Sequence, residues 1–237
     1  MSTGCQFDLC DGSGFLVDEA TNTASDCRCR AGRVARARSH SLSGVIPRRY
    51  RLVSFDTPPV SDLPGHLVRA VRDFARRIDQ QLDDGRGLWL FGDTGTGKTT
   101  LAMLVSRHAL EAGRSVAIYS LPRLLAELRR TFDDDAEQSY TELLDRLATV
   151  DLLHIDDVGA EQTSPWVLEQ LYALINARYE EERSVILTTN IKEREDLAQQ
   201  IGDRTVSRLV QMCEQIPLYG ADARLEYRAP RPAERAS

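Results

Sequence analysis

The chain has 237 residues, a formal net charge of −6, and a composition that is 42% hydrophobic and 28% charged. Domains typically take about 100–200 residues, so one full α/β domain and a small module fit, but two large domains do not. No apolar run approaches the roughly 18 residues that cross a bilayer, and the start MSTGCQFDLCDGSG lacks the segments of a signal peptide. We therefore expect a cytoplasmic protein with no membrane partner.

The composition changes along the chain and suggests four parts. They are a cysteine-bearing head (1–30), a connector rich in Arg, Ser and Gly (31–60), a periodic region (61–230) and a disordered tail (231–237). Eight arginines and no acidic residue lie between Arg28 and Arg51. Such a stretch could neutralise nucleic-acid phosphates, and a solvated flexible connector is an equally good interpretation.

The periodic region alternates helical patterns with short apolar runs. Apolar residues at three- and four-residue steps predict a helix over 67–82. The expected elements that follow are strands at 88–91, 115–120, 152–155 and 185–189, helices at 98–112 and 165–181, and helical stretches around 122–148. Continuous apolar runs are typical of strands buried on both faces, so the pattern predicts an α/β fold with a parallel sheet between helices.

A phosphate-binding loop joins the first of these strands to the next helix. The sequence GDTGTGKT from Gly92 to Thr99 fits G-x-x-x-x-G-K-[ST] between a strand and a helix. Its glycines would let backbone amides surround a phosphate, Lys98 would reach the β and γ oxygens of ATP, and Thr99 would bind Mg²⁺. The predicted nucleotide-binding residues are Gly92, Asp93, Thr94, Gly95, Thr96, Gly97, Lys98, Thr99 and Thr100.

Polar residues end two further strands. Asp156 and Asp157 follow the apolar run Leu152–Ile155, and Asn190 follows Thr188-Thr189. Asp156 would hold Mg²⁺ through water, and Asp157 would orient or deprotonate the attacking water. Asn190 would sense the γ-phosphate and position the water, and it could cap a helix before Ile191-Lys192-Glu193 at the same time. Alternatively, the two aspartates are solvated loop residues.

Four segments in this order resemble the AAA+ ATPases of the DnaC/DnaI-type helicase-loader and IstB-like group: GDTGTGKTTLA, LLHIDDVGAE, RYEEERSVILTTN and GDRTVSRLVQMC. The resemblance runs from about Arg51 to Tyr227. It implies a sheet of five parallel strands, ATP hydrolysis at subunit interfaces, self-association and binding of single-stranded DNA. It also makes Arg208 the arginine inserted into a neighbouring subunit's site and Arg224 the sensor arginine in cis. Arg204 is a weaker candidate for either role, and Arg204 and Arg208 could instead line a solvated helix face.

The chain departs from most AAA+ proteins in two respects. Asp157 stands where many have Glu, which shortens the reach to the attacking water. After Ile216-Pro217-Leu218 only about twenty residues remain, too few for a separate helical lid. The site would therefore depend on a partner subunit for closure.

Four cysteines in the head form two close pairs, C-x4-C and C-x-C, made by Cys5, Cys10, Cys27 and Cys29. In a cytosolic protein this pattern indicates tetrahedral Zn²⁺ bound by thiolates rather than disulfides. Zinc would supply the folding energy of so short a segment. Reduced cysteines in a disordered tail are the alternative, and Cys213 is expected in the core, on an apolar helix face.

These features favour an ATPase that loads or remodels a hexameric DnaB-type replicative helicase on single-stranded DNA, with the head gripping the helicase. An IstB-like transposition helper that activates a transposase would use the same ATPase. A scaffold that holds nucleotide without turnover is a third possibility, opposed by the intact set of Lys98, Asp156, Asp157 and Asn190. DNA contact is expected in 121–148, where Arg123, Arg129 and Arg130 are available unless they form a solvated helix face.

Overall fold

The computed structural model of the chain describes residues 5, 7, 9–18, 23–30, 46–133, 138–159 and 164–222. The predicted tail at 231–237, Arg224 and the first half of the predicted connector (31–45) lie outside these ranges. None of the helices in the described ranges combines the length and apolar character that crossing a bilayer requires.

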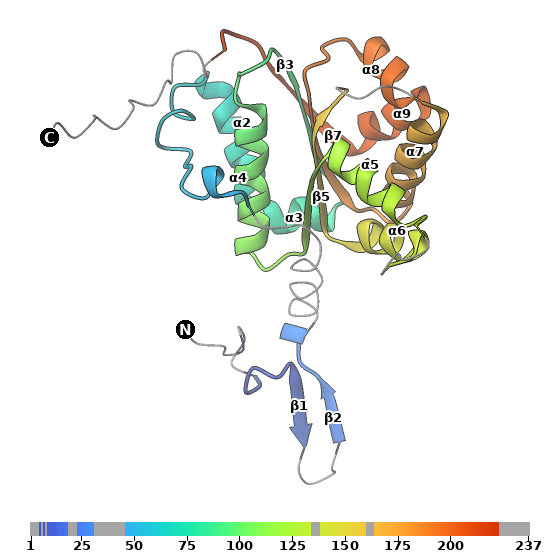
Figure 1. Cartoon of the computed structure of the whole chain (residues 1–237). Helices are drawn as coiled ribbons and strands as arrows, with labels where there is room; N and C mark the ends of the chain where they lie inside the picture. Colours follow the sequence, from blue (N-terminus) through green and yellow to red (C-terminus); the bar gives the residue numbers. More distant parts are fainter. Residues whose placement is uncertain are drawn as a thin grey trace, which may run out of the picture.

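A five-stranded sheet forms the centre of the molecule (Figure 1). Its strands are β3 (Gly87–Gly92), β4 (Val116–Ser120), β5 (Leu152–Val158), β6 (Ser184–Thr189) and β7 (Cys213–Leu218). They lie in the order β4-β5-β6-β3-β7, and every neighbouring pair is parallel. The predicted five-stranded parallel sheet is confirmed, and the carboxyl ends of all its strands meet at one edge.

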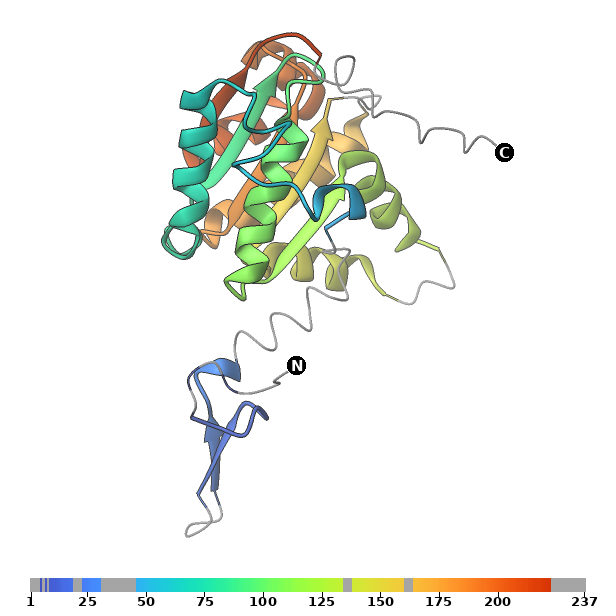
Figure 2. The ribbon, with the colours of Figure 1, turned by 90° about the vertical axis from the view of Figure 1, so that its left-hand side faces the viewer.

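Helices cover both faces of the sheet (Figures 1 and 2). One face carries α2 (Gly65–Arg76), α3 (Ile78–Asp83) and α4 (Lys98–Glu111). The other carries α5 (Leu121–Arg130), α6 (Tyr140–Thr149), α7 (Pro165–Glu180), α8 (Arg194–Ile201) and α9 (Asp203–Met212). The helix expected over 67–82 is two helices, because Arg77 leaves helical geometry at φ −103° and ψ 27°.

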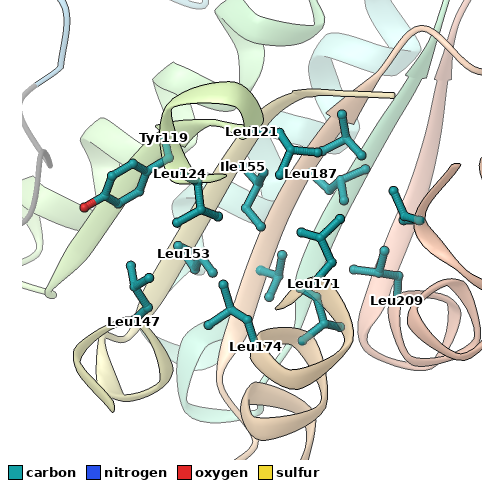
Figure 3. Close-up of a cluster of buried hydrophobic side chains, with 14 of the residues drawn as sticks. Tyr119, Leu121, Leu124, Leu147, Leu153, Ile155, Leu171, Leu174, Leu187 and Leu209 are labelled. Atoms are coloured by element: carbon teal, nitrogen blue, oxygen red, sulfur yellow. The ribbon is translucent and has the colours of Figure 1, made fainter. Parts of the chain in front are cut away.

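The strands hold the two helix layers by sending alternate side chains to opposite faces. In β3, Leu88 and Leu90 are buried with α2 and α4, whereas Trp89 is buried on the side of α5–α9. Figure 3 shows Leu153 and Ile155 of β5 gathered with leucines from the helices of that second layer. Each fully buried leucine or isoleucine contributes about 1.5–3 kcal/mol, which makes the sheet a rigid base for the loops at its edge.

A buried arginine ties together the amino-terminal ends of two strands. Arg178 of α7 is 0% exposed and donates to the carbonyl oxygens of Ser184 and Leu147, both at 2.6 Å. Longer bonds reach the carbonyl oxygens of Ala148 at 3.2 Å and Asp151 at 3.3 Å. Burial lowers the pKa of this guanidinium to about 9, so it remains charged at neutral pH and joins the end of α6 to the starts of β5 and β6.

Part of the predicted connector belongs to the body of the molecule. The short 3₁₀ helix η1 (Arg48–Tyr50) lies in this segment, and Ile46, Phe55 and Val60 are buried with α2 and α4. The predicted division of the chain at residues 30, 60 and 230 stays a prediction, but residues 46–60 contribute to the same core as the P-loop helix.

Cys213 lies in the core as expected, but it is not in a helix. It is the first residue of β7, 8% exposed, with its thiol 3.6 Å from the carbonyl oxygen of Val185. α9 ends at Met212 and β7 begins at the next residue. The spacing of apolar residues does not mark this change, so Cys213 was assigned to the helix instead of the strand.

The described part of the head contains a hairpin of β1 (Phe15–Asp18) and β2 (Thr23–Asp26), paired antiparallel. The amide of Cys27 donates to the carbonyl oxygen of Gly14 at 3.0 Å, which closes the hairpin at its open end. Arg30 forms an ion pair with Asp26 and lies over the Phe15 ring, 4.1 Å from its centroid.

Candidate nucleotide and metal sites

The loop between β3 and α4 follows a path that only glycine permits. Gly92 and Gly95 have φ of 130° and 78°, a region that other residues avoid. A Cβ on Gly92 would lie 2.1 Å from the carbonyl oxygen of Leu218, and one on Gly95 would lie 1.7 Å from Oδ1 of Asp222. The loop leads directly into the amino end of α4, where unpaired amides and the helix dipole favour an anion.

Lys98 is folded into this loop. Its Nζ donates to the carbonyl oxygens of Gly92 at 3.0 Å and Asp93 at 2.5 Å, and the residue is only 7% exposed. Thr96 also supports the loop, since its hydroxyl donates to the Asp93 carbonyl at 2.8 Å. A phosphate group on the loop amides would be a stronger partner for the ammonium than these neutral carbonyls, because hydrogen bonds between ions are the strong ones.

Asp156 lies at the carboxyl end of β5, beside the P-loop helix. Its Oδ1 accepts the hydroxyl of Thr188 at 2.7 Å. Burial raises the pKa of the Asp156 carboxyl, but the neighbouring His154, Thr188 and Thr99 side chains outweigh burial and hold the pKa below its usual value. The group is therefore an anion at neutral pH and, with the Thr99 hydroxyl, offers the oxygen ligands that Mg²⁺ prefers.

A bulge in β5 sets the directions of the two aspartates. β5 pairs with β6 as far as Ile155, and pairing resumes at Val158 after a shift of register. Asp157 in this bulge has φ 60°, and its amide donates to the Thr188 hydroxyl at 2.9 Å. Thr188 thus accepts from one aspartate and donates to the other. Backbone strain of this kind costs about 1–3 kcal/mol and is concentrated at functional sites.

Asn190 lies next to Asp157. Its Nδ2 donates to Asp157 Oδ1 at 3.3 Å, and both side chains are exposed to the cleft side of the sheet edge. The helix-cap role expected for Asn190 does not describe this geometry, because α8 begins at Arg194 with Glu193 as its N-cap.

An ion pair that the sequence did not predict links the P-loop to the segment after Asn190. Lys192 Nζ lies 2.5 Å from Asp93 Oδ1 and 5.5 Å from the Tyr219 ring centroid. The amide of Gly220 donates to Asp93 Oδ2 at 3.2 Å. The hydrogen bond from Lys192 is the main reason that the pKa of Asp93 is lowered. Asp93 therefore connects the loop to two other segments instead of facing a ligand.

A cleft of about 630 Å³ brings most of the predicted residues together. Its lining includes Lys98, Asp156, Asp157, Asn190 and these P-loop residues: Thr94, Gly95, Gly97, Thr99 and Thr100. Gly92, Asp93 and Thr96 are not on its wall. Sequence reasoning missed the opposite wall, which is formed by Arg49, Tyr50, Pro59, Val60 and Leu63. Those residues carry no motif, and only the tertiary structure brings them to the P-loop.

The arginine candidates lie away from this cleft or beyond the described residues. Arg208 on α9 donates from Nε to Asn176 Oδ1 at 3.1 Å and lies 4.2 Å from the Tyr179 ring centroid. Arg204 is exposed, 5.8 Å from the Tyr172 ring centroid. Neither lines its own chain's cleft, so a role for Arg208 in a neighbouring subunit's site stays a prediction. Arg224 is outside the described residues.

The four head cysteines lie together. Cys5, Cys10, Cys27 and Cys29 place their sulfurs within 4.8 Å of one another. Cys5 and Cys27 sulfurs are 3.7 Å apart, and those of Cys10 and Cys29 are 3.5 Å apart. Zn–S bonds of about 2.3 Å in a tetrahedron place the sulfurs about 3.8 Å apart, so the cluster fits zinc. Burial raises the pKa of Cys29 to about 12, whereas at Cys5 hydrogen bonds from backbone amides outweigh burial and lower the pKa to about 6. The thiolate is therefore favoured at Cys5 but not at Cys29.

Comparisons with known proteins show similarity to replicative helicase loaders. The replicative helicase loader DnaC of Escherichia coli strain K12 is 28% identical over 136 residues, which cover 57% of this chain and 55% of that protein. The replicative helicase loader DnaI of Bacillus subtilis strain 168 is 29% identical over 124 residues, 52% of this chain and 38% of that protein. The chain thus spans about half the length of the curated relatives it matches, or less.

A crystal structure of the DnaC helicase loader superposes with a TM-score of 0.63 at 26% identity, covering 73% of this chain and 99% of that one. This likeness confirms the AAA+ fold. The model of the family described as IstB-like ATP binding protein matches residues 30–230. The chain therefore belongs to the family of IstB-like ATP binding proteins.

Proposed function

We propose that this protein is an ATPase that loads or remodels a hexameric replicative helicase on single-stranded DNA. The observation that carries the proposal is the cleft in which the P-loop, Lys98, Thr99, Asp156, Asp157 and Asn190 meet at one sheet edge. The similarity to replicative helicase loaders supports a helicase as the client. The residues of the cleft support ATP hydrolysis as the reaction.

In the proposed reaction Lys98 exchanges its carbonyl partners for the β and γ oxygens of ATP. Thr99 and Asp156 would hold Mg²⁺, which neutralises charge on the phosphates when bound. Asp157 accepts a proton from the water that attacks the γ-phosphorus, and Asn190, already 3.3 Å from Asp157, keeps that carboxylate in place. The bond to the β–γ bridging oxygen breaks, and ADP and phosphate leave.

The proposal also covers the head, the connecting segment and the assembly of the protein. The head at 1–30 holds Zn²⁺ on its four cysteines and grips the client. The segment 31–60 follows, and its residues 46–60 pack against the ATPase domain at 61–230. Copies of the chain associate through the AAA+ interface, where Arg208 enters the neighbouring site. The protein works in the cytoplasm, and single-stranded DNA binds at 121–148.

One observation favours a second client. The matching family model is the IstB-like one, and the cleft serves a transposition helper that activates a transposase equally well. The head cysteines Cys5 to Cys29 precede the matched region, and this extra module is the feature that favours the helicase.

The test is the ATPase rate of the purified protein alone, with single-stranded DNA, and with a DnaB-type helicase, using Lys98→Ala as the control. Turnover that the substitution abolishes and the helicase changes would support the loader. A rate that the helicase does not change but a transposase does would favour the transposition helper over the helicase loader. No turnover under any condition would leave a nucleotide-holding scaffold.

A further inference from the structure

A second set of polar side chains lies behind Asp156, on the side of the sheet that faces α4. His154 of β5 and Ser106 of α4 are both 0% exposed. Ser106 Oγ lies 3.0 Å from His154 Nδ1, and His154 Nε2 lies 3.8 Å from Asp156 Oδ1. Nε2 is buried and makes no hydrogen bond. Buried polar atoms nearly always have a partner, so each exception calls for an explanation.

Packing does not require a histidine at this position. Leu152, two residues earlier on the same face, and Ile186, which stands directly opposite in β6, are both aliphatic and buried. An aliphatic side chain would fill the same space without burying an unpaired N–H. The imidazole is therefore better explained by what its two nitrogens face, a hydroxyl on the P-loop helix and the carboxylate of Asp156.

We infer that His154 is a positioning residue for Asp156, held in its orientation by Ser106. In the neutral ring Nδ1 accepts the Ser106 hydroxyl, which leaves the proton on Nε2, directed at Asp156 Oδ1. A small rotation of the carboxylate turns the 3.8 Å approach into a hydrogen bond. Thr188 already donates to the same oxygen at 2.7 Å, and two donors on one oxygen fix the plane of the carboxylate.

This arrangement also connects the two halves of the proposed magnesium site. Ser106 is on α4, the helix that begins at Lys98 and carries Thr99, whereas Asp156 is on β5. The Ser106–His154 contact therefore fixes the position of α4 relative to β5, and with it the distance between the candidate Mg²⁺ ligands Thr99 and Asp156. The inference rests on the proposed Mg²⁺-nucleotide chemistry, and outer-shell partners of this kind typically change metal affinity about 10–100-fold.

The experiment measures binding of a fluorescent ATP analogue to the full chain, first in EDTA and then across a Mg²⁺ titration. The variants are His154→Leu, which removes both nitrogens, and His154→Gln, which keeps an N–H donor. His154→Leu should raise the Mg²⁺ concentration at half effect about 10-fold or more and leave affinity in EDTA unchanged. His154→Gln should recover most of this loss. Ile186→Val, opposite His154, is the matched control for core perturbation and should keep the wild-type Mg²⁺ dependence.

Two results would overturn the inference. A wild-type Mg²⁺ response in His154→Leu would show that the ring does not position Asp156. An equal loss of affinity in EDTA and in Mg²⁺, shared by Ile186→Val, would show a purely structural role. Failure of the wild-type protein itself to bind the analogue with Mg²⁺ would instead refute the proposed function, so the two failures are distinguishable.

Discussion

Gly92→Ala is the sharpest test of the phosphate loop, because its cost is set by backbone atoms. A Cβ at this position would lie 2.1 Å from the carbonyl oxygen and 2.7 Å from the carbonyl carbon of Leu218. No rotamer change relieves such a contact, so β3 and β7 must separate by more than 1 Å to restore an ordinary distance of about 3.4 Å. That movement breaks the bond from the Asp93 amide to the Leu218 carbonyl at 3.0 Å.

The magnitude follows from these two losses. Positive φ costs a residue with a side chain about 1–2 kcal/mol, and the lost backbone hydrogen bond costs about 1 kcal/mol more. The free energy of unfolding should therefore fall by about 2–3 kcal/mol, which is about 5–10 °C in Tm for a chain of this size. Displacing the loop amides by about 1 Å should weaken nucleotide binding or turnover about 100-fold.

Thermal melting and nucleotide titration on the same preparations check both numbers. Gly65→Ala is the matched control, because Gly65 opens α2 and a Cβ there would meet nothing within 4 Å. This change should leave nucleotide affinity alone and stabilise by up to about 1 kcal/mol. The reasoning fails if Gly92→Ala melts and binds nucleotide like the wild type.

Three further outcomes are expected. Arg178→Leu leaves four carbonyls without their charged donor and should lower the free energy of unfolding by about 3–5 kcal/mol in urea titrations. Arg183→Ala, which removes a partly exposed ion pair with Asp151, should cost no more than about 1 kcal/mol. Equal effects would contradict the role of Arg178. The pKa of Asp93 is lowered in the fold, so its stabilisation is present above an ordinary pKa of about 4 and disappears as the pH falls through the lowered value. In Lys192→Met, Tm should fall less steeply than in the wild type as the pH drops through this range. An unchanged dependence of Tm on pH would refute the role of the Asp93–Lys192 ion pair. Cys27→Ser should abolish bound zinc measured by metal analysis while nucleotide affinity is retained, because the cysteines do not line the cleft; full zinc content in this variant would exclude the cluster.

Much of the fold could be predicted from the sequence because its signals are local. The apolar runs at 88–91 and 185–189 match β3 and β6 to within a residue or two, since a strand buried on both faces has no polar positions to blur its ends. The P-loop motif predicted the turn from β3 into α4 for the same reason. The apolar pattern did not locate β7, α8 or the hairpin of β1 and β2, because these elements are short and their apolar residues are few.

The missing parts of the candidate site depend on contacts between distant residues. Pro59 and Val60 reach the cleft only through the packing of 46–60 on α2 and α4. The pair of Ser106 and His154 is separated by 48 residues and becomes visible only when α4 lies on β5. The Asp93 contact with Lys192 likewise depends on β6 lying next to β3. No spacing rule within a single segment contains this information.

If the protein is the proposed ATPase, its client should be determined by the head rather than by the cleft. The residues that would bind and hydrolyse ATP lie within 30–230, the region shared with the IstB-like family, and either proposed client could use them unchanged. The head adds a cysteine cluster that fits zinc, and four of its apolar side chains are exposed: Phe7, Leu9, Phe15 and Val17. A segment of about 30 residues is too small to bury these side chains in a core of its own. Their exposure makes these side chains available to a partner, so we expect the head to be where a helicase and a transposase are told apart.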